Sequence, residues 1–210
     1  MVWYSISSFS LKWLNNNKPK SLEKIDKYIL IELNKTIENV KKSFQSYKIS
    51  AGKREIENFF WHTFADNYLE IIKNRIYNAS GSKKQSAQFT LYNSLLAILK
   101  MISPITPFIT EEIYQTNYKR IEKDKSIHIS NWPEIKIQKD KETEKTGDLF
   151  IRILAKVRQA KSQAKKPMNA PIILHLDKQT RSILKPTLED LKAVTASKEI
   201  KPGEFKVEFI

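Results

Sequence analysis

The sequence predicts a mainly α protein, in which an antiparallel helix bundle is followed by a small C-terminal α/β appendix. Over residues 21–119, apolar side chains recur at steps of three and four residues, the spacing of one helix face. Only four of the 210 residues are glycine, which disfavours turn-rich β architecture. Strand-like segments fall near the C-terminal end, at 170–177 and 204–210.

The first helix is expected to begin after Ser21, a residue type that caps helix starts, and to end where Ser50-Ala51-Gly52 breaks it. The second helix spans about 54–77 and carries the most regular pattern in the chain. Its apolar residues follow a strict four-residue spacing, which predicts a buried stripe made of Phe60, Phe64, Tyr68, Ile72 and Ile76.

A third helix covers about 85–102 and ends at Ser103-Pro104, because proline disfavours helical geometry in the residue before it. Thr106-Pro107 then opens a fourth helix with proline in its first turn. Four helices joined by short connections predict an up-and-down bundle. Residues 120–137 are expected to lie extended over that bundle.

The composition changes after this segment. Residues 138–148 (QKDKETEKTGD) predict a solvated, charged linker and a domain boundary. The expected division is a lead-in at 1–20, the bundle at 21–137, the linker at 138–148 and a small basic α/β subdomain at 149–210. Within the subdomain we expect, in order, a basic helix at 148–166, a strand at 170–177, a helix at 179–191, a short β-like stretch at 193–198 and a strand at 204–210.

The chain is strongly basic, with a formal charge of +14 and a pI near 9.7, so its partner is expected to be a polyanion, either nucleic acid or an anionic membrane surface. It has no cysteine, which excludes disulfides and cysteine-ligated metal sites. No apolar run is long enough to span a bilayer, and the first residues lack the features of a signal peptide. A cytoplasmic protein is therefore expected.

No complete active site is visible in the sequence, so we predict no catalytic and no metal-binding residues in this chain. The three histidines, at 62, 128 and 175, fall on a helix, an extended segment and a strand, without the spacing of a zinc-binding helix or a catalytic triad. The carboxylate pairs Glu111-Glu112 and Glu189-Asp190 lie near expected helix ends, where they offset the helix dipole.

Basic and aromatic residues are the better candidates for function. Lys53 and Arg54 lie at a helix start, which suits anions. Lys73 and Arg75 suit either a phosphate or the helix dipole, and Trp61 suits either core packing or base stacking. The basic run after 150 exceeds what a solvated face requires. The predicted RNA contacts are Lys53, Arg54, Trp61, Lys73, Arg75, Arg158, Lys161, Lys165 and Lys166.

Several motifs agree in order and spacing with one enzyme family. The stretch 61–77 contains Asp66-Asn67-Tyr68-Leu69-Glu70 followed by Lys73, and 91–114 contains Pro107-Phe108-Ile109-Thr110-Glu111-Glu112. SIHISNWPE follows at 126–134, and Asp26-Lys27-Tyr28-Ile29-Leu30 precedes them. These segments resemble the anticodon-binding region of the valyl-tRNA synthetase family, among the class Ia aminoacyl-tRNA synthetases. The resemblance covers about 20–134 well and 149–176 more loosely.

The resemblance implies that the chain docks the anticodon stem-loop of valine tRNA, reading chiefly the middle adenine and the third-position cytosine. The implied whole enzyme uses ATP and Mg²⁺ to esterify valine to tRNA, whereas this region needs no cofactor. The catalytic signatures of the family are absent, so the chain looks like a fragment that begins after the catalytic core, with 1–20 as the lead-in from that core. Its implied partners are tRNA and the core of the same polypeptide; no membrane is implied, and a monomer is expected.

Three alternatives stay open. The first is the same region of an isoleucyl- or another class Ia synthetase, because amino-acid choice is made in the missing core. The second is a stand-alone basic RNA-binding helical protein. The third is an adaptor on an anionic membrane, which would require an exposed amphipathic helix at 148–166.

Overall fold

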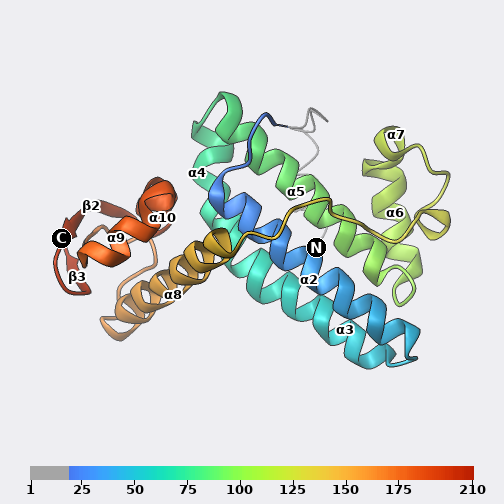
Figure 1. Cartoon of the computed structure of the whole chain (residues 1–210), viewed down its shortest axis with the longest axis horizontal. Coiled ribbons are helices and arrows are strands. Elements are labelled where there is room, and N and C mark those ends of the chain that lie inside the picture. Colours follow the sequence, from blue (N-terminus) through green and yellow to red (C-terminus); the bar gives the residue numbers. More distant parts are fainter. Residues whose placement is uncertain (1–18) are drawn as a thin grey trace.

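The computed structural model describes residues 19–210 and shows helices over most of that length (Figure 1). This confirms the mainly α prediction and the small C-terminal sheet. The predicted lead-in at 1–20 falls outside the described residues, apart from its last two positions.

The first bundle helix, α2 (Lys24–Gln45), packs against α3 (Ile49–Asn58), α5 and α8. The predicted break at 50–52 is wrong, because these residues belong to the first turn of α3. The chain instead turns at Tyr47, which adopts a left-handed φ of 57°. The backbone N–H of Lys48 then donates to the carbonyl of Ser43 at 2.8 Å and closes the end of α2. Gly52 serves close helix packing, since an added Cβ would lie 2.4 Å from the ring of Phe44.

One continuous helical rod follows, made of α3, a π-helical segment η1 (Phe59–Leu69) and α4 (Glu70–Asn78). The π-helix was not predicted, and it explains the strict four-residue stripe. In an α-helix a step of four residues turns about 40° beyond a full turn, so such a stripe would drift around the rod. A π-helix has wider turns, and the same step falls short of a full turn. The two deviations offset each other, and all five predicted stripe residues are buried.

The bundle is completed by α5 (Gly81–Ile102) and α6 (Pro107–Asn117), which meet at the corner formed by 103–106. A short helix α7 (Lys119–Glu122) and a single turn η2 (Ile127–Ile129) interrupt the segment predicted to be extended. Glu111 on α6 accepts hydrogen bonds from the Ser126 hydroxyl and from the backbone N–H of Ile127. The acidic motif of α6 therefore fixes the segment at 126–129 to the bundle.

The helix α8 (Lys141–Gln163) corrects the prediction for residues 138–148, because all but the first two of these residues lie in or cap its first turns. The Asp140 carboxylate accepts from the backbone N–H of Glu142 and Thr143 and caps the helix. Gly147 then allows α8 to touch α2, since an added Cβ would lie 2.2 Å from the ring of Tyr28. Residues 141–148 are thus packed against the bundle instead of forming a solvated linker.

The C-terminal part holds a three-stranded sheet of order β2-β1-β3, with β1 (Ile172–Leu176) parallel to β2 (Ser197–Pro202) and antiparallel to β3 (Lys206–Phe209). The helix predicted at 179–191 is divided by Pro186 into α9 (Lys178–Leu184), a turn η3 (Lys185–Thr187) and α10 (Leu188–Val194). The β-like stretch predicted at 193–198 begins only at Ser197. Buried residues of β1 and of the bundle belong to one continuous core.

Candidate nucleic-acid interface

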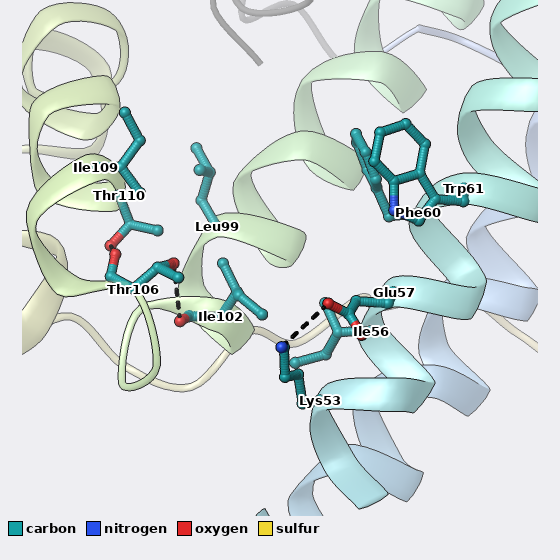
Figure 2. A pocket seen from close by; sticks show the side chains of 10 residues that line it. All are labelled: Lys53, Ile56, Glu57, Phe60, Trp61, Leu99, Ile102, Thr106, Ile109 and Thr110. Carbon is teal, nitrogen blue, oxygen red and sulfur yellow. Dashed lines mark hydrogen bonds and ion pairs between the residues drawn. The ribbon is translucent and has the colours of Figure 1, made fainter. Parts of the chain in front are cut away.

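The turn between α2 and α3 and the corner between α5 and α6 lie at the same end of the bundle (Figure 1). Between α3, η1 and this corner is a cavity of about 260 Å³ (Figure 2). Most of its lining is aliphatic or aromatic, with two charged side chains and two hydroxyls. The lining residues are Lys53, Ile56, Glu57, Phe60, Trp61, Leu99, Ile102, Thr106, Ile109 and Thr110.

Trp61 forms an aromatic wall of this cavity. Its side chain packs edge-on against the Phe60 ring, with centroids 4.8 Å apart and an interplanar angle of 70°, yet 44% of the residue remains exposed. Phe60 itself is buried. The tryptophan therefore packs against the core and also leaves part of its surface exposed, while base stacking stays a prediction. A planar, unpaired base is a suitable ligand for such a surface.

Two cations lie on α3 next to the cavity. Lys53 is exposed and its Nζ lies 3.5 Å from Glu57 Oε1, an ion pair that solvent weakens. Arg54 is exposed and forms no ion pair within the described residues. Across the cavity, Ile109 of α6 is 52% exposed, and the Thr110 hydroxyl donates to the carbonyl of Thr106 at 2.9 Å. An aromatic wall, an apolar floor and adjacent cations suit a base together with its phosphate.

Lys73 is also exposed, but it lies on α4, and its Nζ pairs with Glu70 Oε1 at 2.6 Å. Twenty positions along one rod, with all of η1 between them, separate it from Lys53. The structure therefore does not bring Lys73 to the cavity.

Arg75 cannot contact RNA in this fold, which corrects its prediction. The residue is 4% exposed, and its two terminal nitrogens donate to the Asp26 carboxylate at 2.7 and 2.8 Å. Its Nε lies 3.0 Å from Asp190 Oδ1 on α10, an ion pair without hydrogen-bond alignment. Asp26 is fully buried and also accepts from Tyr68 and Ser86. Through these contacts, the Arg75 side chain on α4 links α2 to α10.

The charge of Asp190 is disfavoured in this setting. Burial raises the pKa of its carboxyl to about 6, although the Arg75 guanidinium acts in the opposite direction. The negative charges of Asp26 and Glu23 raise the pKa further, whereas Lys83 lowers it.

Arg158 and Lys161 both make hydrogen bonds to other parts of the chain. Arg158 donates at 2.8 Å both to the Asn67 side-chain oxygen and to the carbonyl of Asp66, which ties α8 to η1. Lys161 is 1% exposed, and burial lowers the pKa of its ammonium group. It makes three hydrogen bonds of 2.7–2.8 Å, to the carbonyls of Met168, Ala170 and Thr195. Lys161 is therefore unavailable to a phosphate, which corrects its prediction. Arg158 is half-buried, so its RNA contact stays a prediction.

Lys165 and Lys166 are exposed, immediately after the end of α8. That end of α8 and the α2–α3 turn lie far apart along the long axis of the molecule (Figure 1). The predicted contacts on the two parts of the chain thus form separate surfaces. The half of the cavity contributed by the α5–α6 corner was not predicted, because nothing in the local sequence places Ile109 opposite Trp61.

Two further classes of site can be assessed over residues 19–210. No three histidine, aspartate or glutamate side chains there lie close enough together to hold a metal ion. None of the helices in that range combines the length and the apolar character needed to cross a membrane.

The chain matches known proteins over the region that forms this site. Residues 26–177 match the family described as the anticodon-binding domain of tRNA ligase. The chain is 36% identical over 152 residues to a valine–tRNA ligase of Pyrococcus horikoshii, covering 72% of this chain and 17% of that protein. It is 38% identical over 183 residues to a valine–tRNA ligase of Ehrlichia ruminantium, covering 85% of this chain and 22% of that protein. The matched part spans about a fifth of the length of these relatives. The chain belongs to the family of anticodon-binding domains of tRNA ligases.

Proposed function

We propose that this chain is the tRNA-recognition part of a valine–tRNA ligase and docks the anticodon stem-loop of valine tRNA. The observation that carries the proposal is the cavity at the bundle end, where Trp61 and Lys53 present aromatic surface and positive charge together within the matched region. The valine–tRNA ligases among the relatives support the choice of tRNA. Aminoacylation belongs to the remaining length of the proposed enzyme.

In this proposal an unpaired anticodon-loop base enters the cavity and stacks on the exposed face of Trp61. Stacking on an aromatic side chain tolerates any base, so base identity must be read by polar groups at the rim. Lys53, Glu57 and Thr106 are the lining residues that offer such groups outside the core. Arg54 and Lys53 attract the flanking phosphates, which adds affinity without sequence information.

The remaining exposed cations take a secondary role. Lys73, Lys165 and Lys166 lie away from the cavity, so we propose that they attract the tRNA over a distance or contact its backbone elsewhere. We further propose that the protein acts as a monomer in the cytoplasm. ATP and Mg²⁺ are proposed only for the whole enzyme, and no residue of this chain is assigned to either.

The proposal is tested by fluorescence anisotropy with a labelled hairpin of the valine anticodon stem-loop. Trp61→Ala is expected to weaken binding roughly 5- to 150-fold, which corresponds to the loss of about 1–3 kcal/mol of stacking. Trp61→Phe should retain most of the affinity. Tyr77→Ala, which removes an exposed aromatic residue on α4, is the matched control and should leave the affinity unchanged.

Two outcomes would refute the proposal. Wild-type affinity that does not fall as salt concentration rises would exclude phosphate contacts as its basis. Equal affinity for hairpins with the valine anticodon and with its middle adenine replaced would exclude anticodon reading. Tighter binding of an isoleucine anticodon hairpin would instead assign the chain to the isoleucine enzyme.

A membrane-adaptor function would require an exposed apolar face on α8. Four apolar residues of α8 are buried in the core, each 5% exposed or less, namely Phe150, Ile153, Leu154 and Val157, and its Leu149 and Ile151 are partly buried against that core. The structure therefore favours the RNA-binding function.

A further inference from the structure

At the turn between α2 and α3, the packing of the fold does not explain why residue 47 is a tyrosine. The residue is 91% exposed, and its hydroxyl makes no hydrogen bond within the described residues. Its φ of 57° lies in the left-handed region, where a bulky side chain is disfavoured. Neither packing nor local geometry favours tyrosine here.

Glycine would serve this turn better. The hydrogen bonds that end α2 come from the backbone: the N–H of Tyr47 donates to the carbonyl of Phe44, and that of Lys48 to Ser43. Such helix ends usually place glycine at the left-handed position, because glycine adopts it without steric cost. A tyrosine ring kept at this position and fully presented to solvent points to a role outside the fold.

The surroundings of the ring are strongly positive. Residues 41–54 contain no acidic residue and five cations, all of them exposed: Lys41, Lys42, Lys48, Lys53 and Arg54. Only Lys53 forms an ion pair within the described residues. The turn thus combines an exposed aromatic ring with uncompensated charge, the two features by which proteins hold single-stranded RNA.

The turn also lies beside the proposed anticodon site. Tyr47 lies two residues before the start of α3, and Lys53, which lines the cavity, lies about 6 Å along the axis from the first residue of that helix. The α2–α3 turn projects from the same end of the bundle as the α5–α6 corner (Figure 1). A single RNA loop can therefore contact both.

We propose that the α2–α3 turn is a second RNA-binding site, in which an unpaired base stacks on Tyr47 while Lys41, Lys42 and Lys48 hold the adjacent phosphates. The ligand class is single-stranded or loop RNA next to the base bound at Trp61. This inference rests on the proposed function, since it takes the same RNA as its ligand.

The test compares stability and RNA affinity in the same variants of the full chain. Tyr47→Gly removes the strained residue, so its thermal midpoint should rise, while its affinity for the labelled valine anticodon hairpin should fall roughly 5- to 150-fold. Tyr47→Phe keeps the ring and should bind within about twofold of the wild type. Should the glycine variant not fold, Tyr47→Asn supplies the same comparison, because asparagine tolerates the left-handed conformation.

Ala196→Gly is the matched control, since Ala196 ends α10 with a left-handed φ of 53° and lies on the C-terminal part. It should raise the thermal midpoint without changing RNA affinity. The effects of Tyr47→Gly and Trp61→Ala on binding should add in the double variant, because the two bases occupy separate sites.

Three results would overturn the inference. They are unchanged affinity in Tyr47→Gly, an equal loss in Tyr47→Phe, and a loss that disappears when Trp61 is already alanine. A wild-type chain that fails to bind the hairpin would refute the proposed function itself, and the failure of the two proposals is therefore distinguishable.

Discussion

The substitution Asp26→Asn tests the buried network that joins the bundle to the C-terminal part. Asp26 Oδ1 accepts from Tyr68 and from one terminal nitrogen of Arg75, and Oδ2 accepts from Ser86 and from the other nitrogen. An asparagine of the same size keeps one oxygen and turns an NH₂ group toward two donors. Each orientation therefore loses two hydrogen bonds, one of them from a charged group, and leaves Arg75 without a full counter-charge on α2.

The expected loss in the free energy of unfolding is about 3–5 kcal/mol. At the scale of a domain of this size, that loss lowers the thermal midpoint by roughly 6–20 °C. Urea unfolding followed by far-ultraviolet circular dichroism measures it, and the midpoint should move while the slope stays constant.

Two controls make the measurement specific to the buried network. Glu142→Gln removes an exposed ion pair, in which Lys24 Nζ lies 3.2 Å from the carboxylate, and should change stability by less than about 1 kcal/mol. The double variant Asp26→Leu/Arg75→Met should recover much of the loss, because an apolar pair needs no counter-charge. A loss below about 1 kcal/mol in Asp26→Asn would refute the reasoning, since buried donors would then tolerate losing their acceptor.

Three further predictions concern the effect on stability of helix packing, of hydrogen bonds to buried backbone carbonyls, and of pH. Gly147→Ala should destabilise the chain by about 1–3 kcal/mol in the same urea assay, because its Cβ would overlap the Tyr28 ring; wild-type stability would mean that α8 can move away from α2. Lys161→Met keeps the aliphatic stem but leaves three carbonyls without their donor, so a loss of at least about 2 kcal/mol is expected, and thermal unfolding at neutral pH would measure it. Because folding raises the pKa of Asp190 from 3.8 to about 6, the protonated carboxyl stabilises the folded chain. This contribution to the free energy of unfolding is fully present below pH 3.8 and is lost as pH rises through about 6. The wild type should therefore lose up to roughly 3 kcal/mol relative to Asp190→Asn between pH 4 and 7, and parallel urea midpoints for the two proteins over that range would contradict the assignment.

Most of the helices could be predicted from the sequence, because their signals are local. The stripe from Phe60 to Ile76 identified a buried helix face, and Thr106-Pro107 marked the start of α6 at the right residue. The motifs at 61–77 and 91–134 also indicated the family, which the match over 26–177 confirms. These features depend on spacing along the chain and need no knowledge of distant neighbours.

The sequence did not distinguish exposed cations from structural ones. Lysine and arginine look alike in a sequence, whether they face water or a buried acceptor. Arg75 is buried against Asp26, which lies 49 residues earlier in the chain. Lys161 is buried against the carbonyls of a loop and of the end of α10. Only the fold brings these partners within hydrogen-bond distance, so only the fold separates Lys53 and Arg54 from the buried cations.

The sequence by itself determined that this protein is helical, basic and built from the motifs of an anticodon-binding domain, since composition and periodicity are properties of the chain. The tertiary structure decided three other matters: the π-helix that keeps the stripe straight, the packing of residues 141–148 on α2, and the cavity between Trp61 and Ile109. Each depends on which faces meet across long sequence separations, and burial and close packing fix that choice only when the whole chain is folded.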